Sequence, residues 1–300
     1  MKQKVLILGA NGMVGHKLFG ELSKQADLDV WATFREQKTD QKIAKYFGPK
    51  LMQKVVNGIE ANNFISIAHL LKKLKPTVLI NCIGITKQLS KEEDPLEAVE
   101  INAALPHRLA KECRKTKTRM IQLATDCVFS GLKGNYSESD LSDATDLYGR
   151  TKFLGEVNYP HCLTIRTSFI GHELGTKHGL LEWFLSQKVQ TKGFKKAIYS
   201  GMPTVLIAKV MSEHIFKNPK LSGLYQISTS PISKYDLLKL MASAYLKKIK
   251  IVPDSSVKID RSLNSTCFRK ATGYKPLSWP KMIEIMYDDY LECNYKKYNQ

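Results

Sequence analysis

The feature that most constrains this chain is a glycine-rich turn close to its start. A short apolar run over residues 4–8 stops at Gly9, and Gly12 and Gly15 complete a G-x-x-G-x-x-G spacing. A helical pattern then continues to about Ser23. A turn this tight between a strand and a helix needs residues without a β-carbon, and the helix N-terminus then faces a pyrophosphate. The sequence therefore predicts a dinucleotide-binding β-α-β unit here.

Apolar runs and helical patterns alternate through the first half of the chain. The predicted strands are residues 4–8, 29–34, 54–56, 77–82, 120–124 and 162–166, and the predicted helices after the first are residues 64–74 and 95–115. Strands that alternate with helices at this spacing form a mainly parallel sheet, covered on both faces. We expect an α/β fold: a Rossmann-type doubly wound parallel sheet with a smaller C-terminal α/β substrate lobe.

The regular alternation of predicted strands and helices weakens after about Gly171, which indicates a second lobe. The helical patterns there are residues 178–190, 235–247 and 276–290. We expect a dinucleotide-binding domain over residues 1–170, to which residues 202–230 return. Residues 171–201 and 231–300 are expected to form the substrate-binding lobe.

Composition narrows the range of partners and compartments. The 300 residues carry a net charge of +18, which favours an anionic partner, but the basic residues are dispersed. Solvated lysine-rich faces are therefore expected rather than a nucleic-acid surface, which needs basic clustering on one face. The sequence has no run of about 18 apolar residues, so we do not expect a membrane-spanning helix. The first residues do not resemble a secretory signal. The six cysteines lack C-x-x-C pairs and the seven histidines lack metal-ligand spacing, so we expect a metal-free cytoplasmic protein.

Arg35 stands at the end of the second predicted strand. In dinucleotide-binding folds an acidic residue there holds the ribose 2′-hydroxyl, whereas an arginine accommodates a 2′-phosphate. Arg35 therefore favours NADPH, while the neighbouring Glu36 leaves NADH open.

A Y-x-x-x-K pattern is formed by Tyr148 and Lys152. Residues four apart share one face of a helix, and a lysine ammonium beside a phenol lowers the phenol's pKa. Such a tyrosine can exchange a proton near neutral pH. Thr125, at the end of a predicted strand 23 residues upstream, can supply a second hydroxyl.

Taken together, these features resemble an extended short-chain dehydrogenase/reductase, and more closely the dTDP-4-dehydrorhamnose reductase family. The family's short motifs appear here, in chain order, as Asn102-Ala103-Ala104-Leu105-Pro106, Thr125-Asp126-Cys127-Val128-Phe129-Ser130-Gly131, Arg166-Thr167-Ser168, Gly201-Met202-Pro203-Thr204, Gly223-Leu224-Tyr225 and Arg261-Ser262-Leu263-Asn264-Ser265. The likeness runs from residue 4 to about residue 275. The chain departs from the family at Asn81-Cys82-Ile83-Gly84, where an N-x-A segment is usual, at Tyr199-Ser200 in place of Asp-Gln, and at Ser262 in place of proline.

The resemblance implies a reaction and a set of site residues. The reaction is NADPH-dependent reduction of the 4-keto group of a nucleotide-diphosphate deoxysugar, in polysaccharide or glycoconjugate biosynthesis. The catalytic residues implied are Thr125, Tyr148, Lys152 and Asn102, with Asn102 holding Lys152 through water. The cofactor-binding residues implied are Gly9, Asn11, Gly12, Met13, Val14, Arg35, Ile59, Cys82, Ile83, Gly84, Tyr148 and Lys152. The substrate-binding residues implied are Lys87, Thr125, Asp126, Met202, Pro203, Arg261 and Asn264.

Other functions stay open at this point. The related sugar-nucleotide dehydratases carry T-D-E at the strand end, whereas Cys127 replaces the glutamate here, which favours reduction over elimination. A nucleotide-sugar epimerase, another ulose reductase or a non-catalytic NADP-binding regulatory subunit are the alternatives, although the Thr–Tyr–Lys set argues against the last. We expect neither a nucleic-acid nor a membrane partner, and a homodimer remains open.

Overall fold

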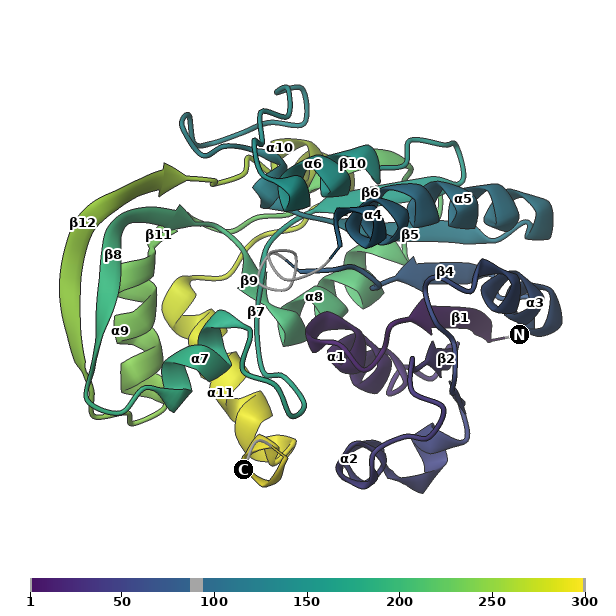
Figure 1. Ribbon diagram of the computed structural model, residues 1–300, viewed down its shortest axis with the longest axis horizontal. Helices are drawn as coiled ribbons and strands as arrows, with labels where there is room; N and C mark the ends of the chain where they lie inside the picture. Colours follow the sequence, from purple (N-terminus) through teal and green to yellow (C-terminus); the bar gives the residue numbers. More distant parts are fainter. Residues whose placement is uncertain (1, 87–93, 299–300) are drawn as a thin grey trace.

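A seven-stranded parallel sheet forms the centre of the computed structural model, which describes residues 2–86 and 94–298 (Figure 1). The strand order is β10-β6-β5-β4-β1-β2-β3, and each neighbouring pair is parallel. The strands are β1 (Gln3–Leu8), β2 (Leu28–Thr33), β3 (Val55–Val56), β4 (Val78–Asn81), β5 (Arg119–Ala124), β6 (Cys162–Arg166) and β10 (Gly223–Gln226). The order 3-2-1-4-5-6 is that of dinucleotide-binding sheets, and the predicted Rossmann-type sheet is confirmed.

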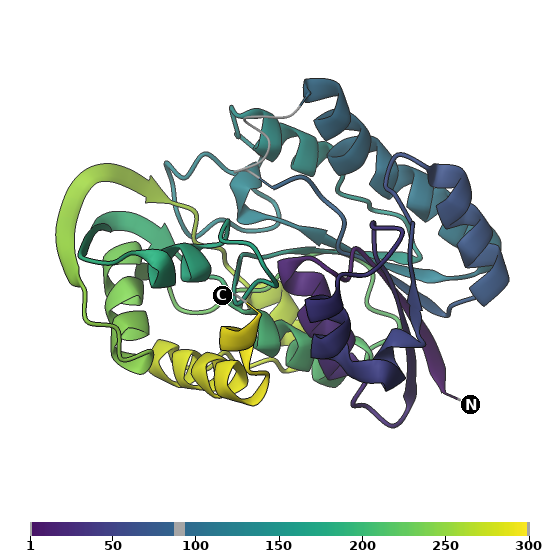
Figure 2. The same ribbon diagram turned by 60° about the horizontal axis from the view of Figure 1, so that its bottom comes forward.

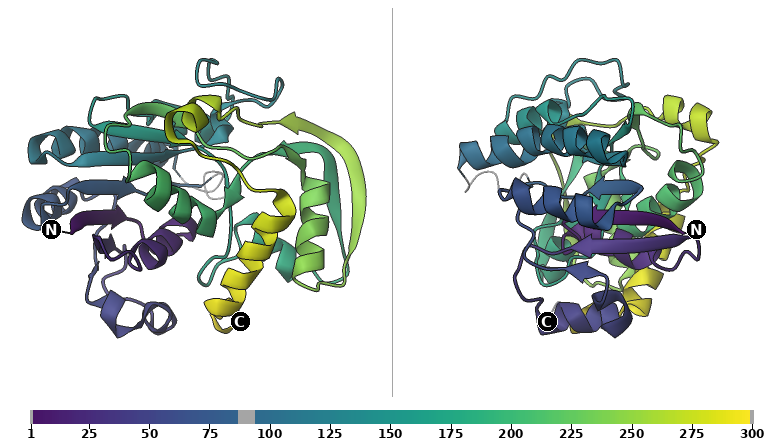
Figure 3. Two further views of the ribbon diagram at one scale, coloured as in Figure 1. Left: turned by 180° about the vertical axis from the view of Figure 1, so that it is seen from behind. Right: turned by 90° about the vertical axis from the view of Figure 1, so that its right-hand side faces the viewer.

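Helices cover both faces of this sheet (Figure 3). Alternate side chains of β1 enter opposite layers: Val5 and Ile7 pack with α1 (Met13–Leu22) and α8 (Thr204–Val210), while Leu6 and Leu8 pack with α3 and α5. Burial on both sides explains why the strands are continuous apolar runs. The remaining helices around the sheet are α2 (Gln41–Met52), α3 (Phe64–Leu74), α4 (Pro95–Ala98), α5 (Leu105–Thr116), α6 (Leu147–Leu154) and α10 (Thr266–Thr272).

A second, smaller sheet lies beside the first, at the left of Figure 1 and again in Figure 2. Its order is β11-β8-β12, with β12 parallel and β11 antiparallel to β8. The elements of this region are α7 (Leu180–Ser186), β8 (Gln190–Tyr199), β11 (Ile232–Ser233), α9 (Lys234–Ala244), β12 (Lys250–Asp260) and α11 (Trp279–Glu292). A separate parallel pair is formed by β7 (Phe169–Ile170) and β9 (Met202–Pro203). In the chain, β7 follows β6 of the central sheet and β9 follows β8 of the smaller sheet.

The structure corrects one of the predicted helices and refines another. The helix expected over residues 178–190 covers only Leu180–Ser186, and residue 190 already begins strand β8. The helix expected over residues 95–115 is three consecutive segments, α4, a π-helical turn (Val99–Ala104) and α5. Such π-turns widen a helix locally and occur often at functional sites; this one carries Asn102.

None of the helices within residues 2–86 and 94–298 is both long enough and apolar enough to cross a membrane.

Candidate active site

The glycine turn forms the first part of the site. Gly9 follows β1 with a positive φ of 72°, and Gly12 is the N-cap of α1. A β-carbon on Gly15 would lie 2.3 Å from the carbonyl oxygen of Gly9, so the helix can start this close to the strand only with glycine there. The first N–H groups of a helix lack partners within it, and in α1 these belong to Met13 and Val14. The turn thus presents donors suited to a pyrophosphate.

The end of β2 lies beside this turn. The Asn11 amide Nδ2 donates to Glu36 Oε2 at 2.9 Å, and Glu36 Oε1 also lies 3.8 Å from Arg35 Nε. The Arg35 side chain is 78% exposed, so its guanidinium can move toward a ligand at the turn. Ile59 is buried, and its backbone N–H donates at 3.1 Å to the carbonyl oxygen of Phe34, the residue before Arg35. The structure therefore brings Asn11, Glu36 and Arg35 together at one end of the turn.

The loop after β4 closes the other side of the turn. A β-carbon on Gly9 would lie 3.1 Å from Ile83 Cγ1 and 3.3 Å from the carbonyl carbon of Cys82. A β-carbon on Gly84 would lie 3.3 Å from Asn102 Oδ1 and 3.7 Å from Lys152 Nζ. The loop therefore lies close to the turn at Gly9 and close to Asn102 and Lys152 at Gly84.

Asn102 holds this loop in place. Its side-chain Oδ1 accepts from Ile85 N at 2.9 Å, and its Nδ2 donates to Ile85 O at 3.1 Å. The side chain is almost fully buried. These two bonds fix the position of the loop, and both the Asn102 side chain and the Lys152 Nζ lie close to Gly84.

The two hydroxyls expected to act together lie together. Thr125 follows β5 and Tyr148 lies on α6, and a hydrogen bond joins their side chains. Burial raises the pKa of Tyr148 well above its usual value, the Cys127 thiol raises it further, and the hydrogen bond with Thr125 acts in the opposite direction. The expected lowering of the Tyr148 pKa by Lys152 is wrong, because burial dominates the shift and Lys152 is not among the groups that cause it. Tyr148 is accordingly a neutral phenol at pH 7, the form that can donate a proton.

Lys152 lies one turn further along α6 and points to the end of β5. Its Nζ donates to Leu123 O at 2.9 Å, two residues before Thr125. Burial lowers the pKa of Lys152 to about 8, while the Glu156 carboxylate raises it. Glu156 is itself held by two bonds from Arg166, at 2.6 and 2.7 Å. The Arg-Thr-Ser strand thus supports the lysine through a buried carboxylate.

Tyr199 is a residue of the site that the motifs did not reveal. Its hydroxyl is buried and has no hydrogen-bond partner within the described part of the chain. Burial and the Asp126 carboxylate raise its pKa, and Asp126 also raises the pKa of Tyr148. The two tyrosines therefore lie within the field of one carboxylate. The signal in the sequence was the departure from Asp-Gln at residues 199–200.

The predicted substrate residues have different surroundings. Met202 is fully buried in the core and Pro203 is buried beside it, so Met202 supports the site and is not a contact surface for a ligand. Arg261 is half-buried, and its Nε donates to Phe129 O at 2.7 Å. Asn264 accepts from Thr266 N at 2.9 Å at the start of α10. Lys87 lies outside the described residues.

Backbone pairing holds the segment with Arg261 and Asn264 against the loop that follows strand β5. A β-bridge joins Tyr136 to Leu263, and Asp260 N donates to Gly131 O at 2.7 Å. Gly131 and Tyr136 belong to the loop that begins directly after Thr125 and Asp126. The segment over residues 260–264 therefore borders the loop that follows strand β5. In the described part of the chain, His, Cys, Asp and Glu side chains form no cluster of three that could hold a metal ion.

Comparison with known proteins identifies the family. The sequence matches the family described as RmlD substrate binding domain over residues 3–290. The chain belongs to this family. The expected resemblance to dTDP-4-dehydrorhamnose reductases is thereby confirmed.

Two kinds of curated relative share this family resemblance. The chain is 23% identical to the bovine (Bos taurus) methionine adenosyltransferase 2 subunit beta, over 94% of this chain and 89% of that protein. It is 29% identical to the dTDP-4-dehydrorhamnose reductase of Salmonella typhimurium, over 54% of this chain and 57% of that protein. The sequence likeness thus extends to an enzyme and to a subunit of a different enzyme.

Solved structures agree with the fold. The dTDP-4-dehydrorhamnose reductase of Bacillus anthracis in complex with NADP superposes with a TM-score of 0.77 at 19% identity, covering 96% of this chain and all of that chain. At this level of identity the likeness establishes the shared architecture alone.

Proposed function

We propose that the protein catalyses the NADPH-dependent reduction of the 4-keto group of a nucleotide-activated deoxysugar. The observation that carries this proposal is the hydrogen-bonded pair of Thr125 and Tyr148 hydroxyls, with Lys152 one helical turn away. These groups lie at the carboxyl edge of a parallel sheet whose first strand ends in the glycine turn, which is where ligands of such sheets bind. The likeness to dTDP-4-dehydrorhamnose reductases supports the same substrate class.

The residues around the glycine turn fit a dinucleotide. The close approach at Gly15 and the N–H groups of Met13 and Val14 provide a cradle for a pyrophosphate. Arg35 would pair with a 2′-phosphate through a charge-assisted bond, while Glu36 would repel it. We infer a preference for NADPH over NADH. The Arg35 guanidinium is exposed and lies 3.8 Å from the Glu36 carboxylate, so it can move away from Glu36 to contact the 2′-phosphate.

The roles of the catalytic residues follow from their protonation states. The bound cofactor supplies a hydride to the carbonyl carbon. Tyr148, kept neutral by burial, donates its phenolic proton to the carbonyl oxygen. The Thr125 hydroxyl would hydrogen-bond the same oxygen, and the Lys152 ammonium would hold the nicotinamide ribose and stabilise the phenolate that Tyr148 becomes.

Recognition of the sugar nucleotide falls to the second lobe, which we take as residues 171–201 and 231–300, with residues 202–230 belonging to the cofactor domain. Within residues 231–300, helix α10 packs against β10 at the edge of the central sheet. Arg261 is the best candidate for the diphosphate, because its bond to Phe129 O uses one of five guanidinium donors. The buried Tyr199 hydroxyl beside Asp126 is a second group that a sugar hydroxyl could satisfy. The six cysteines form no disulfide within the described residues, which supports a reducing, cytoplasmic setting.

A non-catalytic regulatory subunit is the second candidate. The match to the bovine subunit of methionine adenosyltransferase covers 94% of this chain and favours it. The Thr125–Tyr148 pair and Lys152 favour the enzyme, because a protein that only bound the cofactor would not need a neutral phenol at the reacting edge.

Turnover separates the two candidates. The purified chain is mixed with NADPH and a panel of 4-keto nucleotide sugars, and loss of NADPH absorbance is followed beside calorimetric binding of NADPH. Consumption of NADPH with one sugar supports the reductase. Tight NADPH binding without turnover across the panel supports the regulatory subunit, and absence of both contradicts the cofactor proposal itself.

A further inference from the structure

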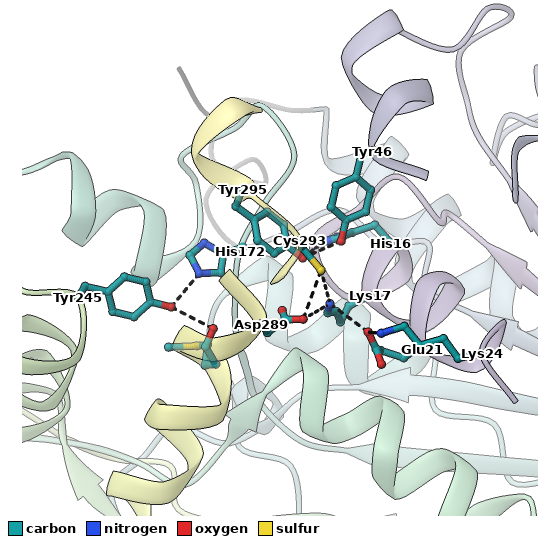
Figure 4. Close-up of polar contacts among 11 residues, drawn as sticks. His16, Lys17, Glu21, Lys24, Tyr46, His172, Tyr245, Asp289, Cys293 and Tyr295 are labelled. Atoms are coloured by element: carbon teal, nitrogen blue, oxygen red, sulfur yellow. Dashed lines mark hydrogen bonds and ion pairs between the residues drawn. The ribbon is translucent and has the colours of Figure 1, made fainter. Parts of the chain in front are cut away.

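The end of the chain is fastened to the first turn of α1 by a buried polar cluster (Figure 4). We call this the tail cluster. It consists of His16, Lys17, Tyr46, Asp289, Cys293 and Tyr295. Its two halves are far apart in sequence, since His16 and Tyr295 are separated by 279 residues. Nothing in the proposed reaction uses these groups directly.

His16 connects the tail to the glycine turn. Its Nδ1 lies 2.9 Å from Gly12 O, and its Nε2 lies 2.8 Å from the Tyr295 hydroxyl. A carbonyl oxygen only accepts, so Nδ1 must carry the proton. Burial lowers the pKa of His16 to about 3, so the ring is neutral and Nε2 accepts from Tyr295.

The direction of the next bond follows from the first. Tyr295 has one hydroxyl proton and gives it to His16, so in the 3.0 Å contact between the two phenols Tyr46 is the donor. The chain of donors therefore runs from Tyr46 through Tyr295 and His16 to the carbonyl of Gly12. This carbonyl also accepts the backbone N–H of His16 at 3.0 Å. Two donors thus fix the orientation of the N-cap residue of α1.

A buried ion pair holds the same two elements together. Lys17, only 1% exposed, donates to Asp289 of α11, and its Nζ also lies 3.3 Å from Glu21 and 3.4 Å from Cys293 Sγ. Breaking such a pair from one side leaves a charge buried without compensation. The tail is therefore held to α1 by charge as well as by the hydroxyl chain.

The segment before α7 joins the same cluster. The His172 ring stacks on Tyr295 with centroids 4.5 Å apart, and its Nε2 contacts the Tyr245 hydroxyl at 2.8 Å. Further along, a β-carbon on Gly179 would lie 3.3 Å from Met13 Sδ, at the start of α1. The second lobe thus reaches the glycine turn both through the tail and through this segment.

We propose that Tyr295 is a positioning residue for the cofactor, acting through His16 on the glycine turn; this rests on the proposed dinucleotide site. A fixed Gly12 carbonyl keeps the Met13 and Val14 N–H groups aimed at one place before the ligand arrives. If the turn became ordered only when the cofactor bound, the entropy lost in ordering it would weaken cofactor binding. Because coupling is reciprocal, a bound cofactor also stabilises residues 289–298.

The test compares three tyrosine-to-phenylalanine variants by calorimetric titration with NADPH, well below their melting temperatures. Tyr295→Phe removes the donor to His16 and is expected to raise the Kd of NADPH by roughly fivefold to tenfold, the range of one buried hydrogen bond with an unpaired acceptor. Tyr46→Phe leaves the Tyr295–His16 bond intact and is expected to change the Kd less than about twofold. Tyr287→Phe on α11 is the matched control, since the Tyr287 ring packs against Tyr245 and its hydroxyl takes no part in the bonds that join the tail cluster.

Hydrogen exchange provides a second readout. In the wild-type chain, NADPH is expected to slow amide exchange in residues 289–298, and Tyr295→Phe is expected to reduce this protection. Equal NADPH affinity of the wild type and Tyr295→Phe, with a lowered melting temperature in the variant, would show a purely structural tail and overturn the proposal. A wild-type chain that binds no NADPH would instead contradict the proposed function, so the two failures are distinguishable.

Discussion

The strand-to-helix packing at Gly15 can be tested with two glycine-to-alanine substitutions in one helix. A β-carbon on Gly15 would meet the carbonyl oxygen of Gly9 at 2.3 Å and the Cα of Ala10 at 2.8 Å, both inside the 3.0 Å limit of real contacts. These are backbone atoms, so α1 must move away from β1. Overpacking of this kind costs about 1–3 kcal/mol. Gly15→Ala should therefore destabilise the fold by about that amount.

Gly20→Ala in the same helix is the control. Its added β-carbon has nothing within 4 Å, so the substitution should stabilise the helix by about 0.5–1 kcal/mol through backbone entropy. The two variants should thus differ by about 1.5–4 kcal/mol in the free energy of unfolding. Urea denaturation followed by circular dichroism measures the difference.

The same movement should affect the ligand. Displacing the N-terminus of α1 moves the Met13 and Val14 N–H groups, so Gly15→Ala should raise the Kd of NADPH by roughly tenfold or more, a change of about 1.4 kcal/mol. Gly20→Ala should leave the Kd unchanged. A Gly15→Ala variant with wild-type stability and wild-type NADPH affinity would refute the packing argument.

Three further predictions concern single side chains. Arg35→Ala should raise the Kd of NADPH strongly and that of NADH little, measured by fluorescence titration; equal losses would remove Arg35 from the 2′-phosphate site. Arg261→Ala should raise KM for the sugar nucleotide and spare NADPH, and Arg261→Lys should recover only part of the loss, because lysine lacks the forked donors; the reverse pattern in steady-state kinetics would place Arg261 at the cofactor. Burial lowers the pKa of Lys152 from 10.5 to about 8, so kcat/KM for NADPH should fall as pH rises through about 8. Because the unfolded chain holds this proton up to about 10.5, the Lys152 contribution to the free energy of unfolding should rise between pH 8 and 10.5, and a Lys152→Met variant should lose both effects.

Strands β1, β4, β5 and β6 of the central sheet were predictable because they are mostly buried apolar runs, whereas the half-buried edge strand β10 was not predicted. The predicted residues 64–74 and 162–166 coincide with α3 and β6. Strands β8 and β12 were not predicted, since most of their residues are partly or fully exposed and include several lysines. Helix α2 also escaped, because it is interrupted by a positive-φ Gly48 followed by a proline.

Within the site, the predictable part was local in sequence. The glycine spacing and the Y-x-x-x-K pattern each lie within one turn or one helix. Contacts between distant segments left no such mark: the Asn11–Glu36 bond and the His16–Tyr295 bond depend on how the layers pack. For the Tyr199 hydroxyl near Asp126, the sequence showed only a departure from the family motif. Met202 illustrates the converse, since its motif implied a ligand contact and its side chain lies in the core.

The measurement that tests the central claim most directly is the turnover of Tyr148→Phe with NADPH and the sugar nucleotide that the wild type reduces. The variant loses one hydroxyl, so it should fold and bind NADPH as the wild type does, while kcat falls by about 10²–10⁴-fold, the usual worth of a general acid. A variant that binds NADPH normally and retains more than about a tenth of the wild-type rate would contradict the assignment of Tyr148 as the proton donor.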